Sequence, residues 1–444
     1  MSTERTRREL HGSAQPTGPQ PVRHGRLKVG SPVAALFRIL GIAVAVALVG
    51  SLSVAGIAIW QVTSSIKTGV HLTDKNGKAI QPPPNVGAIE GGVNLLLAGT
   101  DTRTGQGGAY SSKAELAGSS GAGNNDVTML LHISADHSSA TVVSFPRDLM
   151  VPMPACPLAN GKTVGATSQA MFNTALSRGG LNCVVLTVEK MTGLSIPYAA
   201  EITFDGVVGM SNAVGGVTVC IASPINDPYV GLNLGAGEAT LVGNIALAFV
   251  RSRHGVGDGS DLGRISNQQV FLSALARKLT SAGVLSNPLQ LYSIAKTAAN
   301  SMTLSDGLTN PTTMVAIALA LKDIGLGNMV FLQYPTSSDP ANPNRVIPIA
   351  SSAAVLNAAL VADQPIQLSG QVGRAAELDP NATVSPSVAP APTATSKAGT
   401  KSTAAPTPTP TVSAPTAPVV VLPSTITGQT AAQQTCSKSS GTSR

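Results

Sequence analysis

The sequence predicts an α/β or α+β fold in which helices cover a central mixed β-sheet, preceded by one N-terminal transmembrane helix. Short apolar runs bounded by turn residues are typical of buried strands. Longer segments between them carry apolar residues at helical spacing. A long uncharged stretch lies before both kinds of element. Helices that alternate with sheet elements must bury their apolar faces against that sheet.

The predicted transmembrane helix covers residues 39–60, a run of 22 uncharged, mostly apolar residues. As a helix this run is about 33 Å long, which is enough to cross a bilayer. Four basic residues lie shortly before it, at Arg23, Arg26, Lys28 and Arg38. The positive-inside rule therefore places residues 1–38 in the cytoplasm and the catalytic domain outside the cell membrane. A cleaved signal peptide is the alternative, and it also exports the body of the chain.

The net charge of +7 is unevenly distributed along the 444 residues. Residues 1–38 carry seven Lys/Arg and two Asp/Glu, and residues 380–444 carry four Lys/Arg and no acid. The segment between them has 18 basic and 20 acidic residues and is slightly acidic. The charge therefore gives no support for nucleic acid as a partner.

Composition divides the exported part into three regions. Residues 61–90 are polar, end in a run of prolines and are interpreted as an extracytoplasmic spacer. Residues 91–375 form the predicted catalytic domain. Residues 380–444 are rich in Pro, Thr and Ala, and such a composition predicts a disordered tail.

The domain opens with three short strand candidates, Val93–Leu97, Val127–Ile133 and Ala140–Ser144. The connection between the last two is of hairpin length, so we expect an antiparallel pair. Further strands are predicted at Ile202–Phe204 and Gly216–Cys220.

This arrangement brings polar residues to one sheet edge. Asp126 begins the second strand, and Arg147 follows the third, so the two lie side by side in a hairpin. If the first strand also pairs antiparallel with the second, its end delivers Asp101 and Arg103 to the same edge.

Four later segments have apolar residues at helical spacing and are predicted helices: Leu181–Met191, Ile265–Leu279, Leu289–Ala299 and Thr312–Ile324. Asp261 precedes the second of these as a candidate N-cap. Arg264 and Gln268, four residues apart, share one face of that helix.

An arginine-rich stretch, residues 251–269, is the strongest chemical signal. It holds Arg251, Arg253 and Arg264, and the first two share a face if the backbone is extended. Guanidinium groups match phosphate oxygens in pairs, so converging arginines suit a pyrophosphate. The alternative for an Arg-x-Arg pair is a solvated surface.

Four cysteines suit an oxidising compartment. Cys156 and Cys183 flank a short loop and are expected to form a disulfide, worth roughly 3–4 kcal/mol on the chain-entropy model. Cys220 and Cys436 either pair or stay free.

Taken in order, Ala98–Arg103, Asn124–Leu131, Val143–Asp148 and the arginine-rich stretch resemble the LytR-CpsA-Psr (LCP) family of cell-wall phosphotransferases. The resemblance implies an LCP-like fold. It also implies an enzyme that transfers a glycopolymer from a polyprenyl-pyrophosphate carrier to a peptidoglycan acceptor, releasing polyprenyl phosphate.

The resemblance also implies roles for single residues. Asp101 and Asp126 correspond to the ligands of Mg²⁺ (or Mn²⁺). The pyrophosphate contacts are Arg103, Arg147, Arg251, Arg253, Arg264 and Gln268; Arg147, Arg251 and Arg253 also belong with the two aspartates to the catalytic set. The chain departs from the family pattern twice, with asparagine at Asn124 and Asn267 where many members have arginine.

The proton acceptor is left open among Asp101, Asp126, Asp148 and Asp258. His254 adjoins the arginines without a family role. Three other functions remain: a polyprenyl-pyrophosphate hydrolase, a non-catalytic wall-binding scaffold, and a transcriptional regulator. The regulator is disfavoured because only 38 residues precede the apolar run.

Overall fold

The structure is a computed structural model that describes residues 32–65, 68–80, 92–102, 123–158, 160–281, 284, 288–382 and 418–441. Arg103 lies outside the described residues. The chain divides into two compact units, Met1–Ile57 and Ala58–Arg444. Helix α1 (Pro32–Ser65) includes the apolar segment 39–60. By length and apolar character, none of the helices in the described ranges qualifies to cross a membrane.

A seven-stranded mixed sheet forms the centre of the second unit, in the order β13-β8-β1-β2-β3-β14-β20. Its strands are β1 (Val93–Thr100), β2 (Asn125–Ile133), β3 (Ala140–Phe145), β8 (Tyr198–Ile202), β13 (Met302–Leu304), β14 (Met329–Gln333) and β20 (Gly428–Thr430). The pairs β1–β2 and β2–β3 are antiparallel, as predicted. The pairs β1–β8 and β3–β14 are parallel, which makes the sheet mixed.

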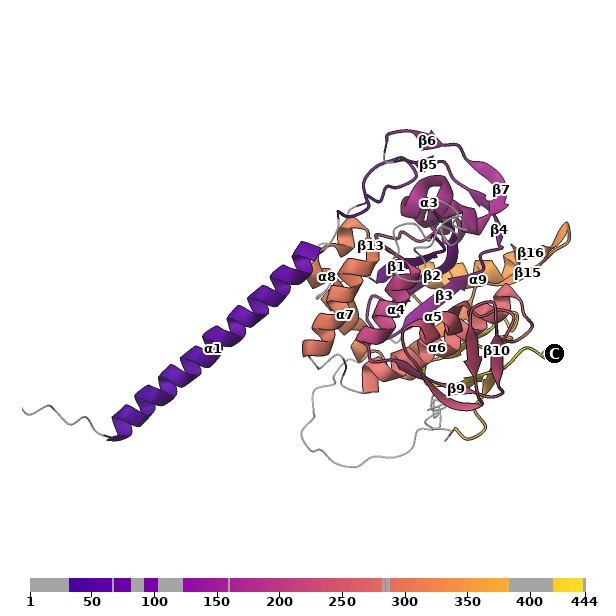
Figure 1. Cartoon of the computed structure of the whole chain (residues 1–444). Helices are drawn as coiled ribbons and strands as arrows, with labels where there is room; N and C mark the ends of the chain where they lie inside the picture. Colours follow the sequence, from indigo (N-terminus) through magenta and orange to yellow (C-terminus); the bar gives the residue numbers. More distant parts are fainter. Residues whose placement is uncertain are drawn as a thin grey trace, which may run out of the picture. The chain divides into compact units, whose positions relative to one another are not determined.

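Helices cover both faces of this sheet (Figure 1). They are α3 (Ala175–Thr192), α4 (Phe204–Ala213), α5 (Asn244–Arg251), α6 (Asp261–Ser281), α7 (Pro288–Ser301), α8 (Pro311–Asp323) and α9 (Ala350–Val361). The four helices predicted from periodicity are therefore confirmed as parts of α3, α6, α7 and α8, except that the last ends at Asp323 and not at Ile324. The strand predicted at Ile202–Phe204 is wrong beyond Ile202, because Thr203 caps α4 by accepting the Gly206 amide.

Side-chain alternation along β1 separates the two faces. Leu96 and Ala98 are fully buried in the cluster that contains α3 and α9 residues. Leu97 and Gly99 point to the opposite side, where they line a cavity. A second core cluster, which includes Val93 and Ile133, packs on this opposite face, and the cavity occupies only part of it.

A second sheet of four strands has the order β12-β9-β21-β18. Its strands are β9 (Val217–Ile221), β12 (Gly237–Leu241), β18 (Ala376–Leu378) and β21 (Thr435–Ser437). The strand predicted at Gly216–Cys220 corresponds to β9. The remaining strands form two-stranded pairs: β4 (Met150–Met153) with β7 (Thr167–Met171), β5 (Cys156–Pro157) with β6 (Thr163–Val164), β10 (Ile225–Asp227) with β11 (Leu232–Leu234), β15 (Thr336–Asp339) with β16 (Asn342–Pro348), and β17 (Ile366–Gln367) with β19 (Val420–Val421).

The prediction of a disordered tail over 380–444 is wrong for residues 418–441. This segment supplies β20 to the edge of the central sheet and β21 to the second sheet. The buried amide of Gln429 donates to Ser273 at 2.6 Å and to the Gln269 carbonyl at 3.1 Å. Leu422 and Ile426 of this segment are buried in the core. The composition of the whole region 380–444 is dominated by residues 380–417, so it gave no sign of this short apolar segment.

The spacer interpretation of residues 61–90 is wrong for the described residues 68–80. Leu72 is buried in the core cluster, and the Val70 amide donates to the Leu304 carbonyl at 2.8 Å. The Thr73 amide donates to the Asn182 side chain at 3.0 Å. These residues are therefore part of the folded domain.

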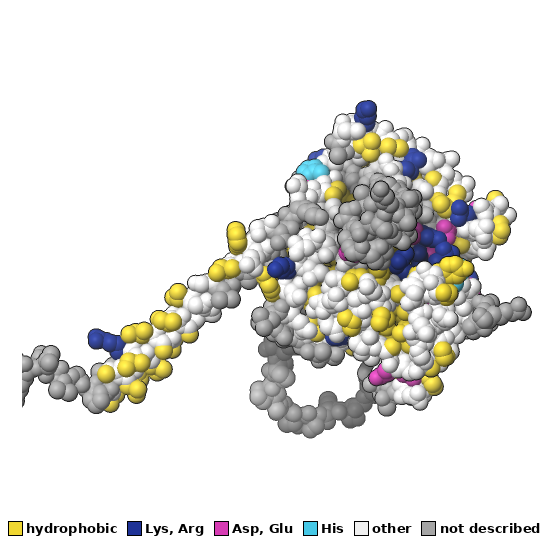
Figure 2. Space-filling model, in the orientation of Figure 1, with side chains coloured by type: hydrophobic (Ala, Val, Ile, Leu, Met, Phe, Trp, Pro, Cys, Tyr) yellow, Lys and Arg dark blue, Asp and Glu magenta, His cyan; other side chains and the backbone are white. Residues whose placement is uncertain are grey.

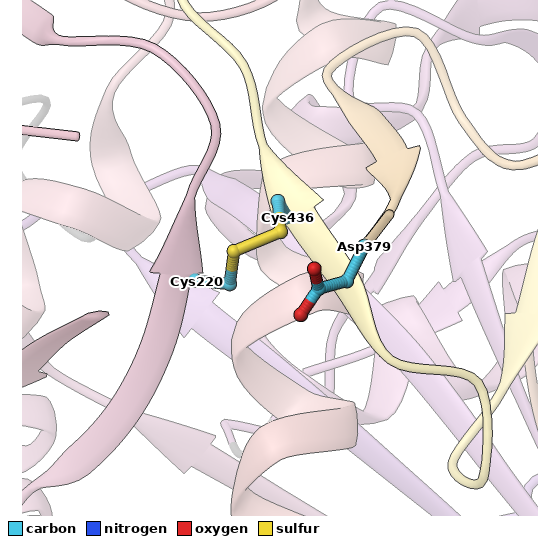
Figure 3. Close-up of side chains that lie close together, drawn as sticks. All are labelled: Cys220, Asp379 and Cys436. Atoms are coloured by element: carbon cyan, nitrogen blue, oxygen red, sulfur yellow. A yellow bond between two sulfur atoms is a disulfide. The ribbon is translucent and has the colours of Figure 1, made fainter. Parts of the chain in front are cut away.

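Both possible disulfides are present. The predicted Cys156–Cys183 bond is confirmed, and it joins β5 to α3. The Cys220–Cys436 bond, which the sequence left open, joins β9 to β21 across 216 residues. Figure 3 shows the Asp379 carboxylate beside this second bond. These three residues are a potential metal-binding group by proximity, but the disulfide leaves no thiolate to act as a ligand.

Candidate active site: an apolar cavity lined in part by arginines

A cavity of about 500 Å³ lies between β1, β2 and β8 of the central sheet and helices α4, α5 and α6. Most of its lining is aliphatic or aromatic. The apolar lining residues are Leu97, Val127, Met129, Ile202, Phe204, Val207, Met210, Val214, Val217, Val230, Leu247, Val250, Phe271, Leu272, Leu275 and Met302. Such an apolar lining suits a hydrocarbon chain.

Charged side chains gather in the same lining. The four arginines are Arg147, Arg251, Arg253 and Arg264, and the described carboxylates are Asp126 and Asp227. Figure 2 shows dark blue Lys/Arg atoms beside magenta acidic atoms and yellow apolar atoms on the visible face. A cavity with this composition can hold an amphiphile that has an anionic group at one end of an apolar chain.

Backbone hydrogen bonds bring the two predicted metal ligands together. The amides of Asp101 and Asp126 both donate to the Asn124 carbonyl, at 3.2 and 3.1 Å. The Asn124 amide donates in turn to the Asp101 carboxylate at 2.7 Å. The predicted convergence at the ends of β1 and β2 is thus confirmed, and Asn124 contributes through its backbone.

Asp126 and Arg147 form the predicted pair across the hairpin. Nη1 of Arg147 donates to both carboxylate oxygens of Asp126 at 3.1 Å. Nη2 of Arg264 donates to the Asp126 carbonyl at 2.6 Å. Burial by itself lowers the pKa of Arg147, but Asp126, Asp261 and Asp148 outweigh it and raise that pKa. Arg147 therefore stays a cation in the partly buried site.

The helix cap predicted at Asp261 is wrong. Asp261 is already the first residue of α6, and the Ser260 hydroxyl accepts the Gly263 amide at 3.2 Å instead. The Asp261 carboxylate is an ion-pair partner of Arg264 at 2.6 Å and accepts the Arg147 amide at 3.2 Å. Its role is to hold these two arginines in place.

Arg251 and Arg253 do not share an extended strand. Arg251 ends α5, and its guanidinium lies 4.1 Å from the ring centroid of Phe204. Arg253 lies in the turn that follows. Both still line the cavity.

Arg253 is held close to other cations. Burial is the main cause of its lowered pKa, and repulsion from Arg147 and Arg264 adds to it. Its Nε atom is buried and has no hydrogen-bond partner among the described residues, as is also true of Nε of Arg264. Nε of Arg147 is in the same condition, so three arginines of the cavity lining each keep a buried donor without a described hydrogen-bond partner, which is costly.

Asp227 is a site residue that the sequence analysis missed. It is fully buried, and its Oδ2 accepts from the Ser252 hydroxyl at 2.7 Å and from the amides of Arg253 and Gly255 at 3.1 Å. Burial raises its pKa, but these hydrogen bonds outweigh burial and lower it. In the sequence Asp227 precedes a proline and resembles an ordinary turn residue.

The two amides of α6 have different environments. Gln268 lines the cavity, and its Nε2 donates to the Val250 carbonyl at 2.8 Å. Asn267 is fully buried, donates to the Phe249 carbonyl at 2.7 Å and accepts from the Ser437 hydroxyl. Asn267 therefore faces the C-terminal segment and is not a substitute for a phosphate-binding arginine.

Of the four carboxylates considered as proton acceptors, Asp126 lines the cavity. Asp148 lies 3.7 Å from Nε of Arg147 and 3.5 Å from Arg345. Asp258 pairs with Arg374 at 2.6 Å and accepts from Ser260. Asp148 is thus paired with one arginine of the lining and one outside it, whereas both partners of Asp258 lie outside the lining.

The donor set of Asp101 and Asp126 fits a hard divalent cation, because Mg²⁺ commonly uses one or two protein carboxylates and takes its other ligands from phosphate and water. The Asn124 backbone holds both residues at one point. Asp126 also holds Arg147, so a cation there would share this carboxylate with the guanidinium.

The sequence of this chain is similar to those of several proteins that have been named. The chain is 30% identical over 270 residues to "Cell wall biosynthesis protein LcpA" of Corynebacterium glutamicum, covering 56% of this chain and 51% of that protein. It is 28% identical over 246 residues to "Polyisoprenyl-teichoic acid--peptidoglycan teichoic acid transferase TagU" of Bacillus cereus, covering 55% of this chain and 70% of that protein. Similarity therefore spans about half the length of LcpA.

Solved structures match the same region. TagV of B. subtilis has a TM-score of 0.48 at 23% identity, covering 62% of this chain and 98% of that one. The "LytR-Csp2A-Psr enzyme from Actinomyces oris" has a TM-score of 0.47 at 22% identity, covering 66% of this chain and 95% of that one. The LytR_cpsA_psr family model matches residues 59–358, and the chain belongs to this family.

Proposed function

We propose that the chain is an exported, membrane-anchored phosphotransferase that moves a glycopolymer from a polyprenyl-pyrophosphate carrier to peptidoglycan. The observation that carries this proposal is that apolar side chains and four arginines line the same cavity. The names of its relatives, a cell-wall biosynthesis protein and a teichoic acid transferase, support the same class of reaction.

The cavity suits both parts of the carrier. The aliphatic lining from α4, α5 and α6 would bind the prenyl chain by removing it from water. Arg147, Arg253 and Arg264 would bind the pyrophosphate, each charge-assisted hydrogen bond contributing about 1.5–3 kcal/mol. The unpartnered Nε atoms of Arg253 and Arg264 would gain acceptors in this complex.

In the reaction, an acceptor hydroxyl oxygen attacks the phosphorus that bears the glycan. The bond from that phosphorus to the bridging oxygen breaks, and polyprenyl phosphate leaves with the electron pair. The hydroxyl proton passes to a base, which we propose is one of the four aspartates named in the sequence analysis; Asp126 is the one that lines the cavity. The arginines stabilise the charge on the phosphate oxygens as the leaving group departs.

Asp101 and Asp126 would hold Mg²⁺, or Mn²⁺, which when bound neutralises phosphate charge. Residues 39–60 of α1 are proposed as the membrane anchor, with the catalytic domain on the extracytoplasmic side. The exposed apolar side chains of α1, among them Ile39, Val46 and Trp60, support this proposal.

The test is a transfer assay with the full chain purified in detergent. The donor is farnesyl pyrophosphate carrying one N-acetylglucosamine, the acceptor is a soluble peptidoglycan fragment, and the buffer contains Mg²⁺. The expected products are the glycan phosphate linked to the acceptor and farnesyl phosphate, detected by mass spectrometry. Arg253→Ala should lose most of this activity, while Arg178→Ala, which removes an arginine outside the cavity lining, should retain it.

The same assay separates the alternatives. Farnesyl phosphate released without modification of the acceptor would identify a hydrolase. The absence of both products in the wild type, with the protein folded, would contradict the transferase and favour a non-catalytic scaffold.

A further inference from the structure

Tyr229 is an unusual surface residue for this chain. Aromatic residues make up only 3% of the sequence, yet Tyr229 is 80% exposed. Beyond α1, no other Phe, Tyr or Trp side chain in the described part of the chain is exposed. A large exposed aromatic ring beside a cavity often marks a binding surface.

The backbone of Tyr229 is held firmly. It lies in the turn between β10 and β11, and its amide donates to Oδ1 of Asp227 at 3.2 Å. The Val230 amide donates to the Asp227 carbonyl at 3.3 Å. The same buried carboxylate binds the Arg253 amide through its other oxygen. One residue therefore fixes both Tyr229 and the arginine turn.

The ring of Tyr229 is also supported. Its centroid lies 4.4 Å from that of His254, with an angle of 42° between the planes. His254 directly follows Arg253, and its carbonyl accepts from the Ser440 hydroxyl at 2.7 Å. The two rings form a surface whose position is set before any ligand binds, which limits the entropy lost on binding.

This surface lies next to the proposed pyrophosphate site. Tyr229 and His254 line the same cavity as Arg147, Arg253 and the aliphatic interior. In the carrier the order is prenyl chain, pyrophosphate, then sugar. A carrier with its chain in the apolar interior and its phosphates at the arginines places its first sugar near the exposed end of the lining, where Tyr229 lies.

We propose that Tyr229 and His254 form a subsite for the first sugar ring of the donor, directly beyond the pyrophosphate. This inference rests on the proposed function and deepens it. A pyranose ring has one face made of C–H groups, and this face packs against the electron-rich face of an aromatic ring. The ring thus contacts the glycan, and the guanidinium groups contact the phosphates.

The experiment compares two soluble probes of equal charge, the methyl ester of farnesyl pyrophosphate and the same lipid carrying one N-acetylglucosamine in place of the methyl group. Their dissociation constants are measured by calorimetry with the full chain in detergent. The wild type should prefer the glycosylated probe. Tyr229→Ala should reduce this preference about tenfold, as expected for one well-packed aromatic contact. Tyr229→Phe should keep it, because the ring remains.

Controls separate the subsite from other effects. Tyr292→Ala removes a tyrosine of α7 that does not line the cavity and should keep the preference. The inference is overturned if Tyr229→Ala keeps the wild-type preference, if it weakens both probes equally, or if Tyr229→Phe loses as much as Tyr229→Ala. If the exposed ring contacts the membrane and not the sugar, Tyr229→Ala should keep the wild-type preference.

The binding experiment distinguishes a failure of the sugar subsite from a failure of the proposed function. A wild type that binds both probes with equal affinity overturns the sugar subsite and leaves the carrier site in place. A wild type that binds neither probe contradicts the proposed function itself.

Discussion

The carboxylate of Asp227 accepts the backbone amide of Arg253 at 3.1 Å, although the two residues are 26 positions apart. The same oxygen accepts from Gly255, where a Cβ atom would lie 2.8 Å from the Cβ of Asp227. Glycine at 255 therefore allows the turn to approach the carboxylate. This contact connects the β10–β11 hairpin to the arginine turn of the cavity.

Asp227→Asn should destabilise the domain by about 3 kcal/mol at neutral pH, because an amide replaces a carboxylate that receives several hydrogen bonds. The pKa of Asp227 is lowered from 3.8 in the folded state. Its ionised form therefore stabilises the fold above this value, and the contribution is lost as the pH falls through the lower, folded pKa. The difference in unfolding free energy between wild type and variant should shrink below about pH 4.

Chemical denaturation at several pH values measures this difference. Asp323→Asn, a change at the end of α8, is the control and should have little effect at any pH. A difference between wild type and Asp227→Asn that grows in acid would contradict the assignment of Asp227 as an ionised acceptor.

The Cys220–Cys436 bond should contribute more to stability than the Cys156–Cys183 bond. The first closes 216 residues and the second 27, and on the chain-entropy model such loops are worth about 5 and 3–4 kcal/mol. Thermal unfolding of the paired Cys→Ser variants measures both. Equal melting temperatures of the two variants would show that β21, which bears Cys436, is held mainly by its sheet and side-chain contacts.

Asn267→Arg should destabilise the protein by several kcal/mol, because it places a charge at a fully buried position that binds Phe249 and Ser437. Asn124→Arg is the matched control, since Asn124 is only partly buried and its described hydrogen bonds are made by the backbone. Its unfolding free energy should stay close to that of the wild type. Thermal melts of the two variants test the difference, and equal melting temperatures would contradict it.

Asp101→Asn should raise the Mg²⁺ concentration needed for half-maximal transfer at least tenfold, because the amide has no negative charge to hold the cation. Asp136→Asn, on the β2–β3 turn, should leave this concentration unchanged. Titration of Mg²⁺ in the transfer assay distinguishes them. An unchanged Mg²⁺ requirement in Asp101→Asn would remove Asp101 from the proposed ligand set.

The part of the site that is formed by residues close together in the sequence is predictable from the sequence. Antiparallel pairing of three neighbouring strands brings Asp101, Asp126 and Arg147 to one edge, and the periodicity of α6 places Arg264 and Gln268 on one face. Both inferences use only the spacing of residues within an element or across a short turn.

Long-range contacts were not predictable in this way. Asp227 and Tyr229 join the site because a separate hairpin packs against the arginine turn, and nothing in their local sequence signals that contact. The β21 strand was assigned to a disordered tail, because composition averages over the polar residues that surround a short buried segment. β21 pairs in parallel with β9, with Cys436 opposite Cys220, although the two cysteines are 216 residues apart in the sequence.

The most direct test of the central claim is mass spectrometry of lipid that co-purifies with the full chain, wild type beside Arg253→Ala and the control Arg178→Ala. The cavity predicts that wild type and Arg178→Ala retain a polyprenyl phosphate or pyrophosphate and that Arg253→Ala loses it. A wild type without such a lipid, and with no measurable affinity for added farnesyl pyrophosphate, would contradict the account.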